Sequence, residues 1–458
     1  MSIKEMTAEY EEWLRSVTKV DEAELKTKHN KMACSEFMFL RATFYCWAHS
    51  FSKHCPALCT ALKVLGVGDL HIENFGTWRD AEGRLSWGVN DFDEACYLPY
   101  TNDLVRLATS AFFALKDGSK DGSKDTSKDD SNRLRLNFEE ACEAILDGYI
   151  EGLKDPKPFV LAEDHGWLRN IVIRKLVDDE SLEIDGKDKD GKDKDGKDKD
   201  GRDKDGKDKD GKDKDGKDKD GKDKDGKDKD GKHKDDVFKK FHEKYRDLAR
   251  IEAPPDARAA LDAGFPKPTP DYHVGHREAG LGSLGRQRFT AVADDWQGGI
   301  IVREAKALAP SAWLWANQSL DASSSSALSA RSIYYPTILV DAVRSPDPWL
   351  KIVDSWVVRR LGPDAFKVEV KHLKLEASKE EELTKKLLHS MGKEIANVHS
   401  HSCDQSNDVL TQVKERSSNA ASSGWLVDAA RTMVERTKED FLDWKKEGFE
   451  CPPEEKES

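Results

Sequence analysis

The stretches Gly68-Asp69-Leu70-His71-Ile72-Glu73-Asn74 and Asn90-Asp91-Phe92-Asp93 are the most informative part of this sequence. They place an Asp, an Asn five residues later, and an Asp-x-Asp pair beyond a predicted hairpin. Phosphoryl transfer requires such groups, because one carboxylate must accept the proton of the attacking hydroxyl. An amide oxygen and a second carboxylate can hold magnesium against nucleotide phosphates. The order and spacing therefore predict a phosphoryl-transfer site, although Asp-rich turns also serve as helix caps and turn stabilisers.

The composition limits the size and the partners of the protein. With 458 residues, the chain is long enough for two or three packed units. Charged residues make up 36% of the sequence, and the formal net charge is −13. Binding to nucleic acid requires a basic face for the phosphate backbone, so this acidity argues against nucleic acid as the main partner.

Two low-complexity segments interrupt the sequence. From Gly186 to Asp235 the unit Gly-Lys-Asp-Lys-Asp occurs ten times, with changes at Arg202 and His233, and a Ser/Lys/Asp/Gly tract occupies 116–131. The repeat has no apolar residue to bury and cannot offset its ordering entropy, so we expect a disordered, solvated coil. It is either a charged interaction tether or an expanded surface-loop insertion. The insertion is favoured because long loops cost little stability.

No targeting or membrane segment is expected. The sequence has no run of roughly 18 apolar residues, and residues 1–6 lack the apolar core of a signal peptide. Eight unevenly spaced cysteines predict reduced thiols in a cytoplasmic protein. Cys55 and Cys59, with His49 and His54 nearby, could bind a metal. Because no second pair follows at zinc-site spacing, buried apolar cysteines are the favoured interpretation.

Hydrophobic periodicity predicts a mixture of helices and strands. A strand at 61–68 leads into the Asp69 loop and a strand at 84–89 returns toward Asp91, so these aspartates should converge at one hairpin-like element. Asn137 and Glu140 resemble a capping box at the start of a helix. Pro254-Pro255 should end a helix at 237–251. Further helices are expected at 8–27, 37–51, 101–115, 379–400 and 424–446, and further strands at 288–293, 299–304, 356–361 and 366–375.

The stretch Gly280-Leu281-Gly282-Ser283-Leu284-Gly285 lies between two predicted strands. Glycines allow backbone N–H groups to approach phosphates without a side-chain clash, although a plain glycine-rich turn has the same composition. A strand on either side favours a phosphate-covering flap over a dinucleotide-binding turn, which needs a strand, a turn and then a helix. The basic residue expected on the following strand is either Arg303 or Lys306.

Taken together, the motifs resemble the domain of unknown function 2252 family, whose function is uncharacterised. The likeness covers nearly the whole chain except the two low-complexity segments. The matching stretches are Lys31-Met32, Phe39-Leu40-Arg41, Gly68-Asp69-x-His71-x-x-Asn74-Phe75-Gly76, Asn90-Asp91-Phe92-Asp93-Glu94, Asp103-Leu104-x-Arg106-Leu107-Ala108, the glycine run with Ser283, Arg303-Glu304-Ala305, Val357-Val358-Arg359 and Ile395-Ala396-x-x-His399. The catalytic stretch is also similar to that of the aminoglycoside and choline phosphotransferases of the protein-kinase-like fold.

This second resemblance implies a role for each site residue. Asp69 is the expected catalytic base, Asn74 and Asp91 are expected magnesium ligands, and Asp93 either orients the loop or joins the metal site. The implied cofactors are ATP and Mg²⁺, and the implied partners are a nucleotide and an unidentified hydroxyl-bearing acceptor. The phosphates would be covered and neutralised by Gly280, Gly282, Ser283, Gly285 and either Arg303 or Lys306.

The order of these parts differs from that of ordinary kinases, in which the glycine flap and its lysine precede the catalytic loop. Here the loop comes first. The helix containing 395–399, which resembles the one that precedes the catalytic loop in such phosphotransferases, comes near the C-terminus. A circular permutation would produce this order. It requires the glycine run 280–285 to lie within about 15 Å of Asp91, the span of a bound triphosphate.

Three residues depart from the expected pattern. Arg303 stands where the family favours Lys, and Val67 stands where the phosphotransferases usually have His. Pro336 should break a helix that could supply a carboxylate partner for the basic residue. The magnesium side of the predicted site is therefore intact, whereas its nucleotide-anchoring side is altered.

We therefore predict an α+β protein with a permuted, two-lobed, protein-kinase-like fold similar to that of the aminoglycoside phosphotransferases. The predicted function is ATP- and Mg²⁺-dependent phosphoryl transfer to a hydroxyl group of a small molecule or a protein. The alternatives are a non-catalytic nucleotide-binding or scaffold protein and a nucleotidyltransferase. The predicted parts are a helical catalytic part at 1–183, the repeat at 184–236, a strand-rich part with the glycine run at 237–378, and C-terminal helices at 379–458.

Overall fold

The computed structural model of the chain describes residues 1–116, 134–161, 165–169, 171, 239, 241–317, 334–363, 365–373, 375, 377–400, 403–418 and 424–452. The low-complexity loop predicted at 116–131, apart from Lys116, and the repeat predicted at 184–236 lie outside these residues. Helices and strands both occur throughout the described residues, so the predicted α+β class is confirmed.

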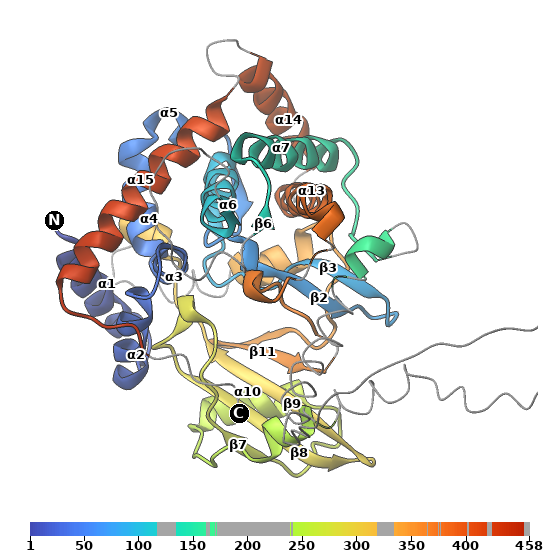
Figure 1. Cartoon of the computed structure of the whole chain (residues 1–458). Helices are drawn as coiled ribbons and strands as arrows, with labels where there is room; N and C mark the ends of the chain where they lie inside the picture. Colours follow the sequence, from blue (N-terminus) through green and yellow to red (C-terminus); the bar gives the residue numbers. More distant parts are fainter. Residues whose placement is uncertain are drawn as a thin grey trace, which may run out of the picture.

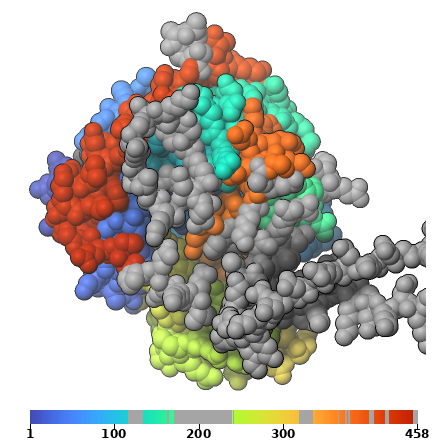
Figure 2. Space-filling view, in the orientation of Figure 1, coloured from blue at the N-terminus to red at the C-terminus, as the bar shows by residue number. Residues whose placement is uncertain are grey.

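The molecule has a helical part and a sheet part. In Figure 1 the helical part lies above the sheet part. Figure 2 shows the yellow-green surface of the sheet part below the blue, cyan and red surfaces of the helices. The helices of the helical part are α1 (Ile3–Val17), α2 (Glu22–Met32), α3 (Glu36–Ala42), α4 (Phe44–His54), α5 (Pro56–Cys59), α6 (Tyr100–Ala114), α7 (Phe138–Lys154), α13 (Glu380–His399), α14 (Cys403–Ser418) and α15 (Trp425–Lys446).

The sheet part is a five-stranded antiparallel sheet with one helix on its face. The helix, α10 (Pro255–Gly264), packs through Ala260 and Leu261 against a strand face whose small residues, such as Ala291 and Ala305, allow its close approach. Pro255 thus begins a helix and does not end one, because the first helical position needs no N–H. The strand order is β10 (Lys351–Val353), β11 (Trp356–Leu361), β9 (Gly299–Ala307), β8 (Arg288–Trp296) and β7 (His273–Gly275).

Two small pairs of strands support the loops that contain the acidic motifs. β1 (Lys63–Gly66) pairs with β4 (Cys96–Pro99), and β2 (Phe75–Arg79) forms a hairpin with β3 (Leu85–Val89). The predicted strands at 61–68 and 84–89 are therefore present. Because β2 starts directly after Asn74 and β3 ends directly before Asn90, the hairpin brings the two motif loops to the same end.

The centre of the helical part is formed by α6, α7 and α13. Almost every residue of α6 is buried, which is typical of a helix surrounded by protein. α7 and α13 lie side by side (Figure 1) and approach closely at Gly148 and Gly392. A Cβ at Gly148 would lie 2.0 Å from the His389 carbonyl oxygen, so only glycine permits this contact.

Several predicted elements are wrong in their bounds. The helix predicted at 8–27 is two helices, because Asp21 caps the N-terminus of α2 with hydrogen bonds from the Ala23 and Glu24 amides. The helix predicted at 37–51 is interrupted at Thr43, whose backbone is not helical. In the described residues of the predicted strand 366–375 there are only one isolated bridge, at Lys367, and a 3-10 turn. Residues 334–341 are helical, so Pro336 does not break a helix there as predicted.

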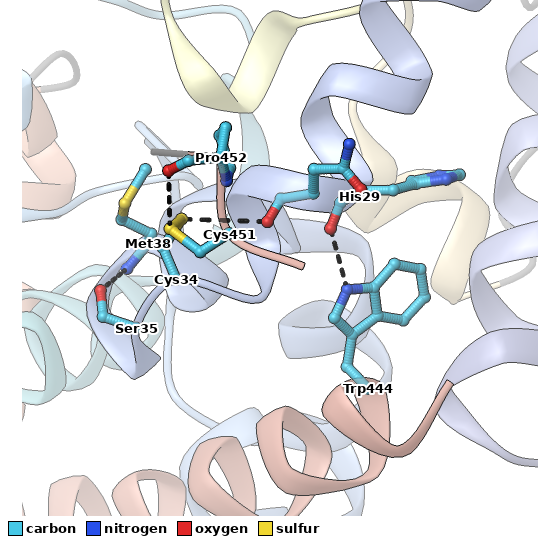
Figure 3. The surroundings of a disulfide bond; sticks show 8 residues. His29, Cys34, Ser35, Met38, Trp444, Cys451 and Pro452 are labelled. Carbon is cyan, nitrogen blue, oxygen red and sulfur yellow. Dashed lines mark hydrogen bonds between the residues drawn. A yellow bond between two sulfur atoms is a disulfide. The ribbon is translucent and has the colours of Figure 1, made fainter. Parts of the chain in front are cut away.

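One pair of cysteines is joined, contrary to the prediction of reduced thiols. Cys34, just after α2, forms a disulfide with Cys451, beyond the end of α15 (Figure 3). Nearby, the Trp444 indole nitrogen donates a hydrogen bond of 3.1 Å to the His29 carbonyl (Figure 3). The two elements lie far apart in sequence, so spacing alone could not pair these thiols. The free cysteines of the described residues are Cys46, Cys55, Cys59, Cys96 and Cys142.

None of the helices in the described residues is both long enough and apolar enough to cross a membrane.

Candidate functional site

A cleft lies where the segment 280–286 of the sheet part meets the helical part. The four predicted acidic and amide side chains lie on its walls, together with residues 280–283 of the glycine run. A Cβ built on Gly282 would lie 3.1 Å from Asp69 Oδ2, so the two predicted halves of the site are in direct contact. The wall residues that the sequence predicted are Asp69, Asn74, Asp91, Asp93, Gly280, Gly282 and Ser283.

The Asn74 side chain connects the two acidic loops. Its Oδ1 accepts a hydrogen bond of 3.1 Å from the Asp91 amide. Its Nδ2 donates to the carbonyl oxygens of Asp69 at 3.2 Å and Asp91 at 3.0 Å. Asn74 therefore fixes the position of both aspartates. Its amide oxygen retains one further lone pair for another partner.

Asp69 is held by a buried arginine from α6. The Arg106 guanidinium is fully buried and donates from Nε to Asp69 Oδ1 at 3.1 Å, and also donates to the Leu40 carbonyl at 2.8 Å. The Asp69 side chain is 18% exposed, and its Oδ2 has no hydrogen bond within the described part of the chain. One oxygen of Asp69 is thus occupied and the other is available to a ligand in the cleft.

The backbone before Asp69 is fixed by a second carboxylate of α6, Asp103. Its oxygens accept hydrogen bonds from the Val67 amide at 2.6 Å and the Gly68 amide at 3.0 Å. Asp103 also lies 3.0 Å from His399 Nε2 at the end of α13, and the other ring nitrogen of His399 contacts the Tyr149 hydroxyl at 2.8 Å. The buried network links the Asp69 loop to the C-terminal part of the chain. In the sequence, Asp103 belongs to the family-like stretch Asp103-Leu104-x-Arg106-Leu107-Ala108 and is not predicted as a site residue.

Lys306 on β9 is the basic residue that reaches the acidic pair. Its ammonium lies 2.9 Å from Asp91 Oδ2 and 2.6 Å from Asp93 Oδ2. Burial opposes the ionisation of Asp91, but the Lys306 ammonium outweighs it and lowers the pKa of this carboxyl. Burial and then the charge of Asp91 raise the pKa of Asp93. The carboxylates and the lysine form one coupled charge cluster.

Arg303 is not brought to the cleft. Side chains alternate between the two faces of a strand, so residues 303 and 306 of β9 point to opposite sides of the sheet. Arg303 faces α10, where its Nε donates to the Gly264 carbonyl at 2.7 Å and its guanidinium stacks over Trp349 at 4.6 Å. Of the two basic residues that the sequence left open, only Lys306 lies beside the acidic loops.

The glycine run forms a compact turn between β7 and β8. Leu281–Ser283 is a single 3-10 turn, and Gly280 and Gly285 adopt positive φ angles of 74° and 94°. α2 holds this turn: Lys28 Nζ donates to the Gly282 carbonyl at 3.0 Å, and Glu24 accepts from the Gly285 amide at 3.0 Å. Gly285 is occupied by this contact and does not line the cleft.

Several basic groups on the cleft walls were not predicted as site residues. They are Lys28, Arg41, Arg286 and Lys367, and they come from four separate segments of the chain. Burial lowers the pKa of both Lys28 and Lys367 to about 8. No local spacing connects these residues, so only the assembled fold could identify them.

No group of three or more His, Cys, Asp or Glu side chains is arranged to hold a metal ion in the described residues. This applies also to the cysteines and histidines near residue 55 that the sequence raised as a metal site. Magnesium, however, usually takes one or two protein carboxylates and completes its shell with phosphates and water. The Asp91 and Asp93 pair is compatible with that smaller requirement.

Comparison with known proteins gives one match. The model of a family described as "Uncharacterized protein conserved in bacteria (DUF2252)" matches residues 19–145. No curated protein and no solved structure matches the chain. The matched stretch contains Asp69, Asn74, Asp91 and Asp93 with their supporting residues Asp103 and Arg106, whereas the glycine run and Lys306 lie outside it. The chain is thus similar to this uncharacterised family over the segment that builds the acidic half of the cleft.

Proposed function

We propose that the protein is an ATP- and Mg²⁺-dependent phosphotransferase acting on a hydroxyl group of a small molecule or a protein. The observation that supports this proposal is the assembly of Asp69, the Asp91 and Asp93 pair and residues 280–283 on the walls of one cleft, with Lys306 paired to both Asp91 and Asp93. Lys306 is 215 residues from Asp91 in the sequence, so their meeting is a property of the fold.

In the proposed reaction, Asp69 Oδ2 accepts the proton of the acceptor hydroxyl. The hydroxyl oxygen forms a bond to the terminal phosphorus of ATP, the bond from that phosphorus to the bridging oxygen breaks, and ADP leaves with the electron pair. Such transfer depends mainly on positioning and on charge stabilisation, so a carboxylate already held by Arg106 can serve. Arg106 fixes the orientation of the base, and Asn74 fixes its distance from Asp91.

The residues that would hold Mg²⁺ are Asp91 and Asp93. Asp93 Oδ1 is buried without a hydrogen bond in the described part of the chain, and a buried acceptor without a partner is costly unless a ligand satisfies it. Both carboxylates already converge on one cation, the Lys306 ammonium. Bound Mg²⁺ would neutralise charge on the nucleotide phosphates. Asn74 would contribute chiefly by orienting Asp91, since its amide oxygen already accepts a hydrogen bond.

A permuted, kinase-like arrangement accounts for the chain order. The acidic loops come first, the glycine run follows far downstream, and α13 comes later still, yet His399 of α13 contacts Asp103 behind the first loop. Gly282 lies beside Asp69, and residues 280–283 line the same cleft as Asp91, which supports the closeness to Asp91 that a permutation requires. Lys306 also weakens one argument for a non-catalytic protein, because a lysine and not Arg303 lies beside the acidic pair.

The proposal is tested by Mg²⁺-dependent ATP binding and turnover, with Asp91→Asn as the diagnostic variant. ATP at 100 times its Kd should raise the unfolding free energy by about 2.7 kcal/mol, and only when Mg²⁺ is present. Asp91→Asn should remove this stabilisation and reduce ATP hydrolysis by about 100-fold or more, the size of effect seen when one transition-state charge contact is lost. ADP release and thermal unfolding provide the two measurements.

Asp443→Asn, on the exposed side of α15, is the matched control and should behave as the wild type. Equal stabilisation of the wild type with and without Mg²⁺, or undiminished turnover in Asp91→Asn, would contradict the proposal.

A further inference from the structure

Lys367 is a basic residue of the cleft for which the proposed reaction has no role. Its segment runs beside β2, where the Val368 amide donates to the Phe75 carbonyl and the Thr77 amide donates to the Phe366 carbonyl, both at 2.8 Å. These bonds fix the backbone on either side of Lys367, and its side chain lies on the cleft wall. The ammonium has no hydrogen bond or ion pair within the described residues.

Two neighbouring groups on the same wall also have unused hydrogen-bonding capacity. His71 is 7% exposed, and its Nδ1 is buried without a partner among the described residues. Arg41 pairs with Glu73 at 2.5 Å, but its Nε is buried without a partner. Buried polar atoms are rarely left unpaired, because they lose their hydration without compensation. Two such atoms beside the unpaired Lys367 ammonium indicate a ligand that accepts hydrogen bonds.

The charges around the cleft indicate the sign of that ligand. Each acidic side chain in or beside the cleft has a cationic partner: Asp69 has Arg106, Asp91 and Asp93 have Lys306, Glu94 has Arg286, and Glu73 has Arg41. Lys367 is therefore a positive charge without a counter-ion in this part of the molecule. Burial, followed by repulsion from Arg41, lowers the pKa of Lys367 to about 8. A bound anion would relieve both effects.

We propose that Arg41, His71 and Lys367 form a phosphate-binding subsite of the cleft. A phosphate group presents several acceptor oxygens in different directions, and these residues offer an ammonium, a guanidinium Nε–H and a ring N–H. The proposal rests on the proposed function for the identity of the ligand. The phosphate is then either the terminal phosphate of the nucleotide or a phosphate carried by the acceptor. Binding of the anion itself does not depend on catalysis.

Isothermal titration with inorganic phosphate tests the subsite directly. Lys367→Met should weaken phosphate binding about tenfold or more, the expected loss of one charge-assisted hydrogen bond. Lys367→Arg should retain most of the affinity and shows that the segment still folds. Lys371→Met is the matched control, because Lys371 is exposed and lies on the same segment. Phosphate binding that is equal in the wild type and Lys367→Met would overturn the proposal.

Competition then identifies the source of the phosphate. If the subsite takes the terminal nucleotide phosphate, a non-hydrolysable ATP analogue with Mg²⁺ should exclude inorganic phosphate, whereas ADP with Mg²⁺ should not. If it takes a phosphate of the acceptor, inorganic phosphate should bind equally well with the ATP analogue present. Phosphate binding that depends on Lys367 in a protein without ATP turnover would leave the subsite standing and reject the phosphotransferase. ATP turnover without phosphate binding that depends on Lys367 would reject the subsite and support the phosphotransferase.

Discussion

Asp103 lies outside the cleft, yet it determines the conformation of the loop that carries Asp69. Its carboxylate accepts from the amides of Val67 and Gly68 and contacts His399, and all of its side chain is buried. Gly68 adopts a φ angle of 80°, so the turn is one that needs both a glycine and an external acceptor. A buried carboxylate with several donors is a positioning group for Asp69.

Replacing Asp103 by Ala should therefore destabilise the whole protein. Two buried amides would lose their acceptor, each at a cost of about 1–3 kcal/mol, so we expect the unfolding free energy to fall by about 2–6 kcal/mol. Urea denaturation measures the change. Asp147→Ala, at an exposed position of α7, is the control and should change stability by less than about 0.5 kcal/mol. A midpoint in Asp103→Ala equal to that of the wild type would show that the amides have other acceptors.

Lys306 and Arg303 show that the position of a residue in a strand determines which face of the sheet its side chain occupies. Both are basic and both are buried, but alternation sends one to the acidic loops and the other to α10. Glu304 shares the face of Lys306 and accepts from Arg288 at 2.6 Å and from Arg359 at 2.8 Å. Strand alternation thus places a buried network of arginines around Glu304 on the same face as Lys306.

At the scale of elements, α13 packs against the hairpin β2–β3 through a buried glutamate. Glu394 is fully buried, and a Cβ at Gly88 of β3 would lie 2.1 Å from its Oε1. Burial raises the pKa of Glu394 from its usual value near 4.5 to about 7, although the nearby Arg344 guanidinium opposes the increase. The folded protein thus holds a proton on Glu394 at pH values where the unfolded chain has released it.

This proton makes the stability of the folded protein, in which α13 packs on the β2–β3 hairpin, dependent on pH. Between about pH 4.5 and pH 7 the folded state binds one more proton than the unfolded state at Glu394, so its contribution to stability falls as pH rises. Glu394→Gln, which imitates the neutral acid, should match the wild type near pH 4.5 and exceed it by about 3 kcal/mol above pH 7. Urea denaturation across this range is the measurement.

Glu381→Gln, at an exposed position of the same helix, should show no such pH-dependent difference. If the difference between Glu394→Gln and the wild type stays constant from pH 4.5 to pH 8, Glu394 ionises normally and the interpretation is wrong.

At the scale of the whole molecule, the C-terminal segment is fastened to the N-terminal helices. The disulfide joins Cys34 to Cys451 over a sequence separation of 417 residues (Figure 3). The Trp444 ring stacks on Phe449 with 4.5 Å between the ring centroids and also contacts the His29 ring. α2, which ends just before Cys34, also holds the glycine run through Glu24. α2 therefore connects the disulfide-bonded C-terminal segment to the glycine run at the edge of the cleft.

Reducing the disulfide should lower the unfolding free energy by about 2–4 kcal/mol, because a long closed loop restricts the unfolded chain. Dithiothreitol should therefore destabilise the wild type in urea but leave Cys451→Ser unchanged, since that variant has no bond to reduce. Thiol titration of the unfolded protein provides the independent count of bonded cysteines. A wild type whose stability is the same with and without dithiothreitol would contradict the proposed contribution.

Features that depend on short-range geometry could be predicted from the amino-acid sequence. The strands beside Asp69 and Asp91, the hairpin between them and the helix capped by Asn137 all follow from local patterning. Because only one hairpin separates Asn74 from Asp91, their proximity was readable from the sequence. The mixed α+β class followed from the same patterns.

Which distant groups meet depends instead on the packing of the whole chain. This packing selected Lys306 over Arg303, since strand alternation fixes the relative faces but not which face the cleft occupies. It brought Gly282 to Asp69, placed His399 behind Asp103 and joined Cys34 to Cys451. These contacts depend on how whole elements pack, and packing is the sum of many long-range contacts that no local spacing encodes.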